Sequence, residues 1–100
     1  MIIYNVTSSV DKEIFEDWIS WMKDKHIPDL IKTGLFTDYK IVKVLSHDDE
    51  ETFSYAVQYF AKSVADVEEY FRKHAPRLRD DVQQRYGDKV VSYRTLLEEI

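Results

Sequence analysis

The sequence has no cysteine, and its 100 residues include only two glycines and two prolines. The absence of cysteine excludes disulfides, thiol catalysis and cysteine-based metal sites, and it is typical of a cytoplasmic protein. The scarcity of glycine excludes a glycine-rich loop that cradles phosphates. We therefore expect short connections and a chemistry that needs neither a thiol nor such a loop.

Long apolar runs and clusters of basic residues are also missing. No window approaches the ~20 apolar residues of a membrane-spanning helix, and the N-terminus lacks the basic and apolar regions of a signal peptide. The net charge is −5, and the basic residues are interleaved with acidic ones. Phosphate contacts need clustered lysine and arginine. The sequence thus predicts a cytoplasmic protein that binds neither membranes nor nucleic acid.

What the sequence does contain is enough apolar material for one core. Hydrophobic residues make up 44% of the chain, with seven tyrosines, five phenylalanines and two tryptophans. A chain of this length is typical of one domain, and it buries only roughly 65% of its unfolded surface. We therefore expect a single domain over residues 1–100, which association would help to stabilise.

Hydrophobic periodicity alternates between the period of a strand and that of a helix. It predicts strands at 2–8, 36–45, 53–61 and 90–96, and helices at about 11–25, from Pro28 to Gly34, and from 63 to 87 with a break near Pro76. The order β-α-β-β-α-β is that of the ferredoxin-like fold. Right-handed crossovers place the helices on one face of a four-stranded antiparallel sheet, an α+β architecture that leaves the other face open.

The open face of this sheet carries little charge. Alternation places Ile3, Asn5 and Thr7 on one face of the first strand, and Ala56 and Gln58 on one face of the third. A face that is neither charged nor fully apolar suits a homodimer interface or the lining of a small cavity. We expect two copies to pair through their sheets as a dimeric α/β barrel.

Several segments spread over the chain resemble a bacterial family, domain-of-unknown-function family 4286. They are residues 1–7, 18–22, 26–28, 33–36, 55–59 and 74–79. The resemblance implies a ferredoxin-like fold and assigns no catalytic residue and no cofactor. The fold is in turn similar to dimeric α/β-barrel proteins, which include cofactor-free monooxygenases, haem-handling enzymes and ligand-sensing modules.

Clusters that could carry chemistry are few. The histidines His26, His47 and His74 lie too far apart in sequence for a local metal site, and the acidic segment 47–51 lacks the ligand alternation of a calcium loop and is typical of a solvated hairpin tip. No serine lies in a G-x-S-x-G elbow. The pattern predicts neither a metal nor a cofactor, and it identifies no catalytic residue.

One basic cluster allows two interpretations. It consists of Lys73, His74, Arg77 and Arg79. It could bind an anion beside a helix that starts at Pro76, or it could be a solvated face paired with nearby acids, which is the interpretation that surface charges favour.

A ligand site, if the protein has one, is predicted between the paired sheets. It would include Asn5, Gln58 and Arg94, with His26 or Trp21 at its mouth. Alternation alone does not decide whether Arg94 or one of its neighbours joins the open face. The alternative is that the two amides bond each other and fix the register of the dimer.

Two classes of function agree with these patterns. The first is a non-enzymatic dimeric module that binds a small molecule or a protein partner, and the lack of an acid, base or nucleophile cluster favours it. The second is a cofactor-free monooxygenase- or isomerase-like enzyme, in which buried polar groups stabilise an enolate.

Overall fold

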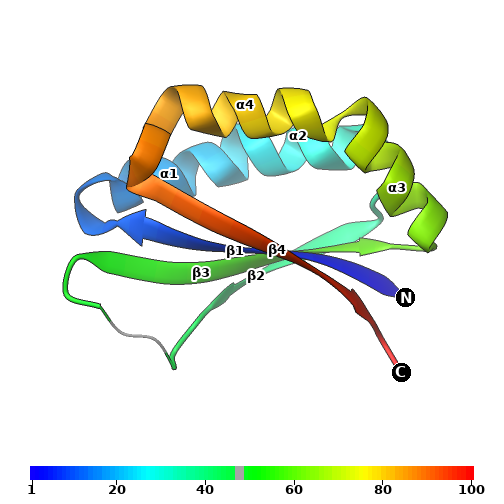
Figure 1. Ribbon diagram of the computed structural model, residues 1–100, viewed down its shortest axis with the longest axis horizontal. Helices are drawn as coiled ribbons and strands as arrows, with labels where there is room; N and C mark the ends of the chain where they lie inside the picture. The colour runs from blue at the N-terminus through cyan, green and yellow to red at the C-terminus, as the bar shows by residue number, and fades with distance from the viewer. Residues whose placement is uncertain (47–48) are drawn as a thin grey trace.

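The computed structural model describes residues 1–46 and 49–100, and within them four strands form one antiparallel sheet (Figure 1). The strands are β1 (Ile2–Asp11), β2 (Asp38–Lys43), β3 (Thr52–Ala61) and β4 (Val90–Glu98), in the spatial order β2-β3-β1-β4. This order places β1 and β3 in the centre of the sheet and β2 and β4 at its edges. It confirms the predicted ferredoxin-like fold.

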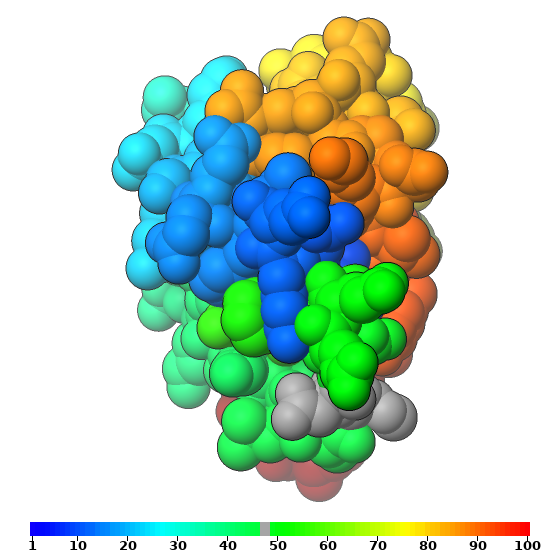
Figure 2. All heavy atoms as spheres, turned by 90° about the vertical axis from the view of Figure 1, so that its left-hand side faces the viewer, coloured from blue at the N-terminus to red at the C-terminus, as the bar shows by residue number. Residues whose placement is uncertain are grey.

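The helical segments all lie on one face of the sheet (Figure 1). They are η1 (Lys12–Ile14), α1 (Phe15–Trp21), η2 (Met22–His26), α2 (Ile27–Lys32), α3 (Val64–Lys73), α4 (Ala75–Tyr86) and η3 (Gly87–Lys89). We call the segment from η1 to α2 the first helical arm and the segment from α3 to α4 the second helical arm. Figure 2 shows the two arms side by side above the strands. None of the helices within the described residues is long and apolar enough to cross a membrane.

The core lies between the helices and the central strands, and it is rich in aromatic rings. Tyr4 of β1 stacks on Tyr59 of β3 with 5.9 Å between ring centroids, and on Phe36 with 6.0 Å. Tyr70 of α3 completes this group at 5.6 Å from Tyr4. All four rings are buried. Burial of such a side chain stabilises the fold by about 1.5–3 kcal/mol, so these rings hold α3 onto the sheet.

Strand β1 is longer than predicted because two serines that suit helix capping instead bond across the sheet. Ser8 Oγ lies 2.7 Å from Ser92 Oγ on β4, and Ser9 Oγ donates to Thr52 Oγ1 on β3 at 3.3 Å. The N-cap of the first helical segment is Asp11, whose side chain accepts a hydrogen bond from the backbone N–H of Glu13 at 2.8 Å.

The predicted gap before Pro28 is filled by a π-helical turn, so the first helical arm runs without interruption from η1 to α2. A proline lacks the N–H that an α-helix needs at that position. In segment η2 the N–H of Ile27 reaches back five residues to the carbonyl of Met22. This wider turn absorbs the proline within the helix, as such insertions commonly do.

The other predicted stops are confirmed. Gly34 and Gly87 have φ values of +80° and +58°. They follow the ends of α2 and α4 in a backbone conformation that favours glycine. The second arm breaks at His74, between α3 and α4, as Pro76 predicted. The acidic hairpin tip was predicted over 47–51, and its residues His47 and Asp48 lie outside the described residues.

Candidate functional site

A small cleft opens between the helices and the covered face of the sheet. Its volume is about 40 Å³, which accommodates about three water molecules at ~10–15 Å³ each. We call it the helix–sheet cleft, and it is lined by Tyr4, Val6, Ser8, Trp18, Met22, His26, Leu30, Val57, Tyr59, Tyr70, Arg79, Val82, Val90, Ser92 and Arg94. The inner wall is thus aromatic and aliphatic, with a few polar groups, which is the usual composition of a small-molecule site.

The helix–sheet cleft continues into a wider surface groove between α4 and β4. This α4–β4 groove has a volume of about 360 Å³. The two cavities share Arg79, Val82, Val90, Ser92 and Arg94. These shared residues lie where the two cavities meet, a place that we call the passage, and both arginines are among them.

Tyrosine hydroxyls supply part of the cleft's polarity. Arg79 donates to the hydroxyl of Tyr4 at 3.4 Å, and its guanidinium carbon lies 5.5 Å from the ring centroid of Phe71. Burial raises the pKa of Tyr59 and of Tyr70, with the neighbouring tyrosine Tyr4 adding to both shifts. Both hydroxyls are therefore neutral at physiological pH and can donate or accept a hydrogen bond.

His26 is a half-buried histidine that lines the cleft. Its Nδ1 is buried and has no hydrogen-bond partner within the described residues. Burial lowers the pKa of His26 to about 4, although Asp29 and Asp81 act in the opposite direction. The imidazole is therefore neutral at physiological pH, and it carries a nitrogen that the described residues leave without a hydrogen-bond partner.

Trp21 lies behind His26 rather than at the mouth of the cleft. The two rings stack with 5.2 Å between centroids. Trp21 lines a different, exposed hollow, where Arg85 lies 5.5 Å from its ring centroid. The prediction placed His26 or Trp21 at the mouth of the site; the structure brings the two rings together, but only His26 borders the cleft.

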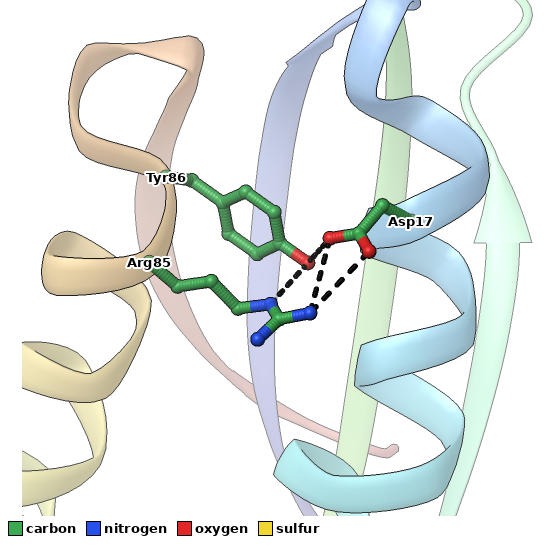
Figure 3. A network of polar contacts seen from close by, with 3 residues as sticks. All are labelled: Asp17, Arg85 and Tyr86. Carbon is green, nitrogen blue, oxygen red and sulfur yellow. Dashed lines mark hydrogen bonds and ion pairs between the residues drawn. The ribbon is translucent and has the colours of Figure 1, made fainter.

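A polar network on the same side joins the two helical arms (Figure 3). Tyr86 of α4 donates through its hydroxyl to Asp17 of α1 at 2.8 Å, and the Arg85 guanidinium lies 3.3 Å from both carboxylate oxygens of Asp17. Arg85 Nε also donates to the Tyr86 hydroxyl at 3.1 Å. The network ties the C-terminal end of α4 to α1 and thereby fixes the helices that carry Trp21 and the cleft wall.

Arg94 lies on the opposite face of the sheet from the two amides, and this corrects the predicted site. In the β1–β4 register Arg94 pairs with Val6, whereas Asn5 pairs with Thr95. Side chains of a strand alternate between faces, so Arg94 shares the covered face with Val6 and lines the helix–sheet cleft. The residue that joins Asn5 on the open face of β4 is Thr95.

The two amides do lie side by side, as predicted. Asn5 and Gln58 are directly paired between β1 and β3. Asn5 is buried at 9% exposure, but its Nδ2 donates to Thr7 Oγ1 at 3.0 Å rather than to Gln58. The predicted candidates therefore divide into an open-face pair, Asn5 and Gln58, and a cleft pair, His26 and Arg94.

The open face continues onto β4 as an apolar surface. Val91, Tyr93 and Leu97 share the face of Asn5 and are all exposed, the first two at 62%. By contrast, the short edge strand β2 presents charged side chains along DYKIVK. Charge protects an edge strand from pairing with other chains. The uncovered apolar surface is thus concentrated at the β4 side of the sheet.

The basic cluster does not act as one unit. Lys73 forms an exposed ion pair with Glu69 at 3.5 Å, and His74 stacks on Tyr70 at 6.4 Å. Arg77 lines a shallow hollow with His74, while Arg79 lies at the cleft. Within the described residues no group of three His, Asp or Glu side chains is arranged to hold a metal ion.

Sequence reasoning missed Tyr4, Tyr70 and Arg79 as cleft residues. Two signals were available. Tyrosines at core-facing positions carry hydroxyls that need a partner, and Arg94 is the one charged residue of the strand VVSYRTLLE before its terminal Glu98.

Comparison with known proteins identifies the family and the fold. The chain belongs to the family described as Domain of unknown function (DUF4286), whose model matches residues 1–100. No curated protein matches the chain.

Solved structures give the same architecture. An ethyl tert-butyl ether D family protein from Bacillus halodurans is 13% identical with a TM-score of 0.70, and the match covers 100% of both chains. A Deinococcus radiodurans protein assigned by name to the antibiotic biosynthesis monooxygenases is 14% identical, TM-score 0.69, over 99% of this chain and 92% of the other. A dimeric ferredoxin-like protein from an uncultured marine organism is 15% identical, TM-score 0.61, over 99% and 97%. At these identities the similarity shows the fold alone.

Proposed function

We propose that this member of the DUF4286 family is a cytoplasmic, homodimeric module that binds a small molecule in the helix–sheet cleft. The observation that carries the proposal is the cleft's composition. His26 is among the residues that line the apolar, aromatic interior, and its Nδ1 is a buried polar atom for which the described residues provide no partner. A buried polar group without a partner costs about 1–3 kcal/mol, and a ligand that bonded Nδ1 would remove that cost.

The proposed dimer uses the open face rather than the cleft. Val91, Tyr93 and Leu97 expose apolar surface beside the uncharged pair Asn5 and Gln58. A second copy would cover this surface. A dimer of standard size buries ~1,600 Å² in total. A protein of similar fold that is described as dimeric supports a dimer in general.

The test of the binding site is a fragment screen by ligand-observed NMR that includes neutral, anionic and cationic aromatic compounds. Replacing Val82 by Trp should abolish binding, because Val82 lines the passage and the larger ring fills it. The matched controls Asn5→Ala and Gln58→Ala lie on the other face and should leave binding unchanged. Hits that persist in Val82→Trp and disappear in the open-face variants would contradict the proposed site.

A second candidate is a cofactor-free monooxygenase-like enzyme, which the Deinococcus radiodurans neighbour brings into consideration. The observation in its favour is that His26 is neutral and has a free nitrogen beside an aromatic cleft, as a general base requires. A pKa of about 4 makes this a weak base, and general bases work best with a pKa near the operating pH. Binding without chemistry is therefore the first proposal.

Oxygen uptake separates the two candidates. An oxygen electrode should record ligand-dependent uptake that disappears in His26→Phe if the protein is an oxygenase. If a ligand binds in the cleft and no oxygen is consumed, the protein is a binding module and not an oxygenase.

A further inference from the structure

We infer that the helix–sheet cleft selects small organic monoanions, carboxylates in particular, through Arg79 and Arg94. This inference deepens the proposed small-molecule site and rests on it. The first observation is the sign of the charge on the residues that line the cleft.

The cleft is a basic site in an acidic protein. The chain has 19 acidic and 14 basic residues, yet the lining of the cleft contains two arginines, one histidine and no carboxylate. Asp88 borders the α4–β4 groove but not the cleft itself. A negatively charged group that entered the cleft would therefore meet donors on several sides.

The two arginines are free to receive such a group. Within the described residues no carboxylate lies within ion-pair distance of Arg79 or Arg94, although Lys25, Lys73 and Arg85 each have one. Within the described residues, Arg79 donates a hydrogen bond to the Tyr4 hydroxyl at 3.4 Å and lies over the Phe71 ring. The long hydrogen bond to Tyr4 orients the guanidinium without neutralising it. Arginine matches a carboxylate with two parallel N–H donors.

The geometry also sets the size and orientation of the ligand. The arginines line both the cleft and the wider groove, so the anionic group would sit at the passage between the two. The inner space of about 40 Å³ takes a short apolar chain of about three carbon atoms at ~10–15 Å³ each against the tyrosines and Val57, and a larger substituent would extend into the groove. The charge at the passage and the apolar interior together describe a small carboxylic acid in its ionised form.

Isothermal titration with two pairs of probes tests the inference: propionate against propionamide, and butyrate against butyramide. Each pair has nearly the same shape and differs in charge. We expect each carboxylate to bind at least tenfold more tightly than its amide, and its affinity to fall as salt is raised, because salt screens charges at an open passage.

Variants then assign the effect to the arginines. Arg79→Gln and Arg94→Gln should each lower carboxylate affinity about tenfold and leave amide affinity unchanged. Arg77→Gln removes an exposed arginine of the same helix that does not line the cleft, so it should change neither. Circular dichroism and thermal unfolding of each variant show whether it is folded.

The outcomes separate this inference from the proposed function. Equal binding of amide and carboxylate, blocked by Val82→Trp, would overturn the selection of anions and keep the site. Carboxylate binding that is insensitive to Arg79→Gln and Arg94→Gln but lost in Arg77→Gln would place the anion elsewhere and overturn the inference. No binding of either carboxylate would also overturn it, whereas the proposed function fails only if the wider fragment screen finds no ligand in the cleft.

Discussion

The two faces of the sheet are built from alternate residues of the same strands, yet they differ in what completes them. On the covered face, Tyr4 and Tyr59 are sealed by helices from the same chain. On the open face, Tyr93 and Val91 remain exposed beside the buried Asn5. The covered face is complete except for a small cleft with unused donors, whereas the open face lacks a whole layer. The first deficit fits a small molecule, and the second fits a protein surface.

The largest effect that separates the faces is expected from removing one tyrosine on each. Tyr59→Ala should lower the free energy of unfolding by about 3–5 kcal/mol, because a large buried ring leaves a cavity. Tyr93→Ala removes an exposed ring and should act only through the dimer. Urea unfolding at two protomer concentrations tells them apart, since only a dimer contribution depends on concentration. A concentration-dependent loss in Tyr59→Ala alone would contradict the assignment of faces.

The next effect is a pH dependence that belongs to the covered face. The pKa of His26 in the folded protein is about 4, below its ordinary value of 6.5. Between these two values the unfolded chain binds more protons at His26 than the folded protein does. The contribution of His26 to the free energy of unfolding is therefore fully present above pH 6.5 and falls as the pH drops toward 4. The loss is at most roughly 3 kcal/mol at 1.36 kcal/mol per unit.

The measurement for His26 is a comparison of urea unfolding between the wild type and His26→Phe at pH 7, 5.5 and 4.5. Carboxylates titrate in both proteins, so the difference between the two curves isolates the histidine. The free energy of unfolding of the wild type, relative to that of His26→Phe, should fall as the pH is lowered across this range. A constant gap would mean that the imidazole titrates normally.

The open face is tested by a charge placed within it. Val91→Asp should weaken the dimer at least 100-fold, about 2.7 kcal/mol, because each copy would bury an unpaired carboxylate. Val64→Asp is the matched control, since Val64 is also an exposed valine but lies at the start of α3. Light scattering should give 12.0 kDa, the mass of one chain, for Val91→Asp, and twice that mass for the control. A wild-type mass of one chain at micromolar concentration would remove the dimer altogether.

The smallest effect concerns how firmly the helices cover the sheet. Tyr86→Phe removes the 2.8 Å hydrogen bond to Asp17 and the bond from Arg85 Nε and should cost about 1 kcal/mol, as for an ordinary hydrogen bond, because the Asp17 side chain is exposed. Lys25→Ala removes a surface ion pair with Asp29 and should cost less than 0.5 kcal/mol, as i,i+4 pairs usually do. Equal effects in thermal unfolding would mean that the network in Figure 3 contributes no more than an ordinary surface pair.

The amino-acid sequence by itself determined the order of the elements, because that order depends on local periodicity. Strands, helices, the break near Pro76 and the stops at Gly34 and Gly87 all follow from residues close to one another. The placement of Asn5 and Gln58 on one face of neighbouring strands also followed, since the fold makes their strands neighbours and alternation fixes their faces, whereas their direct pairing is a matter of register. The length of β1 did not follow, because Ser8 and Ser9 suit helix caps as well as strands until Ser92 and Thr52 lie across from them.

Only the tertiary structure decided which residues form the candidate site. Arg94 could have joined either face, and a shift of one residue in register moves every side chain of a strand to the other face. The observed register pairs Arg94 with Val6 and so places it on the covered face, where it lines the cleft together with His26 and Arg79. These residues come from distant parts of the chain, and no local pattern relates them. Their meeting depends on how strand β4 and helix α4 lie against each other, which is a property of the folded chain.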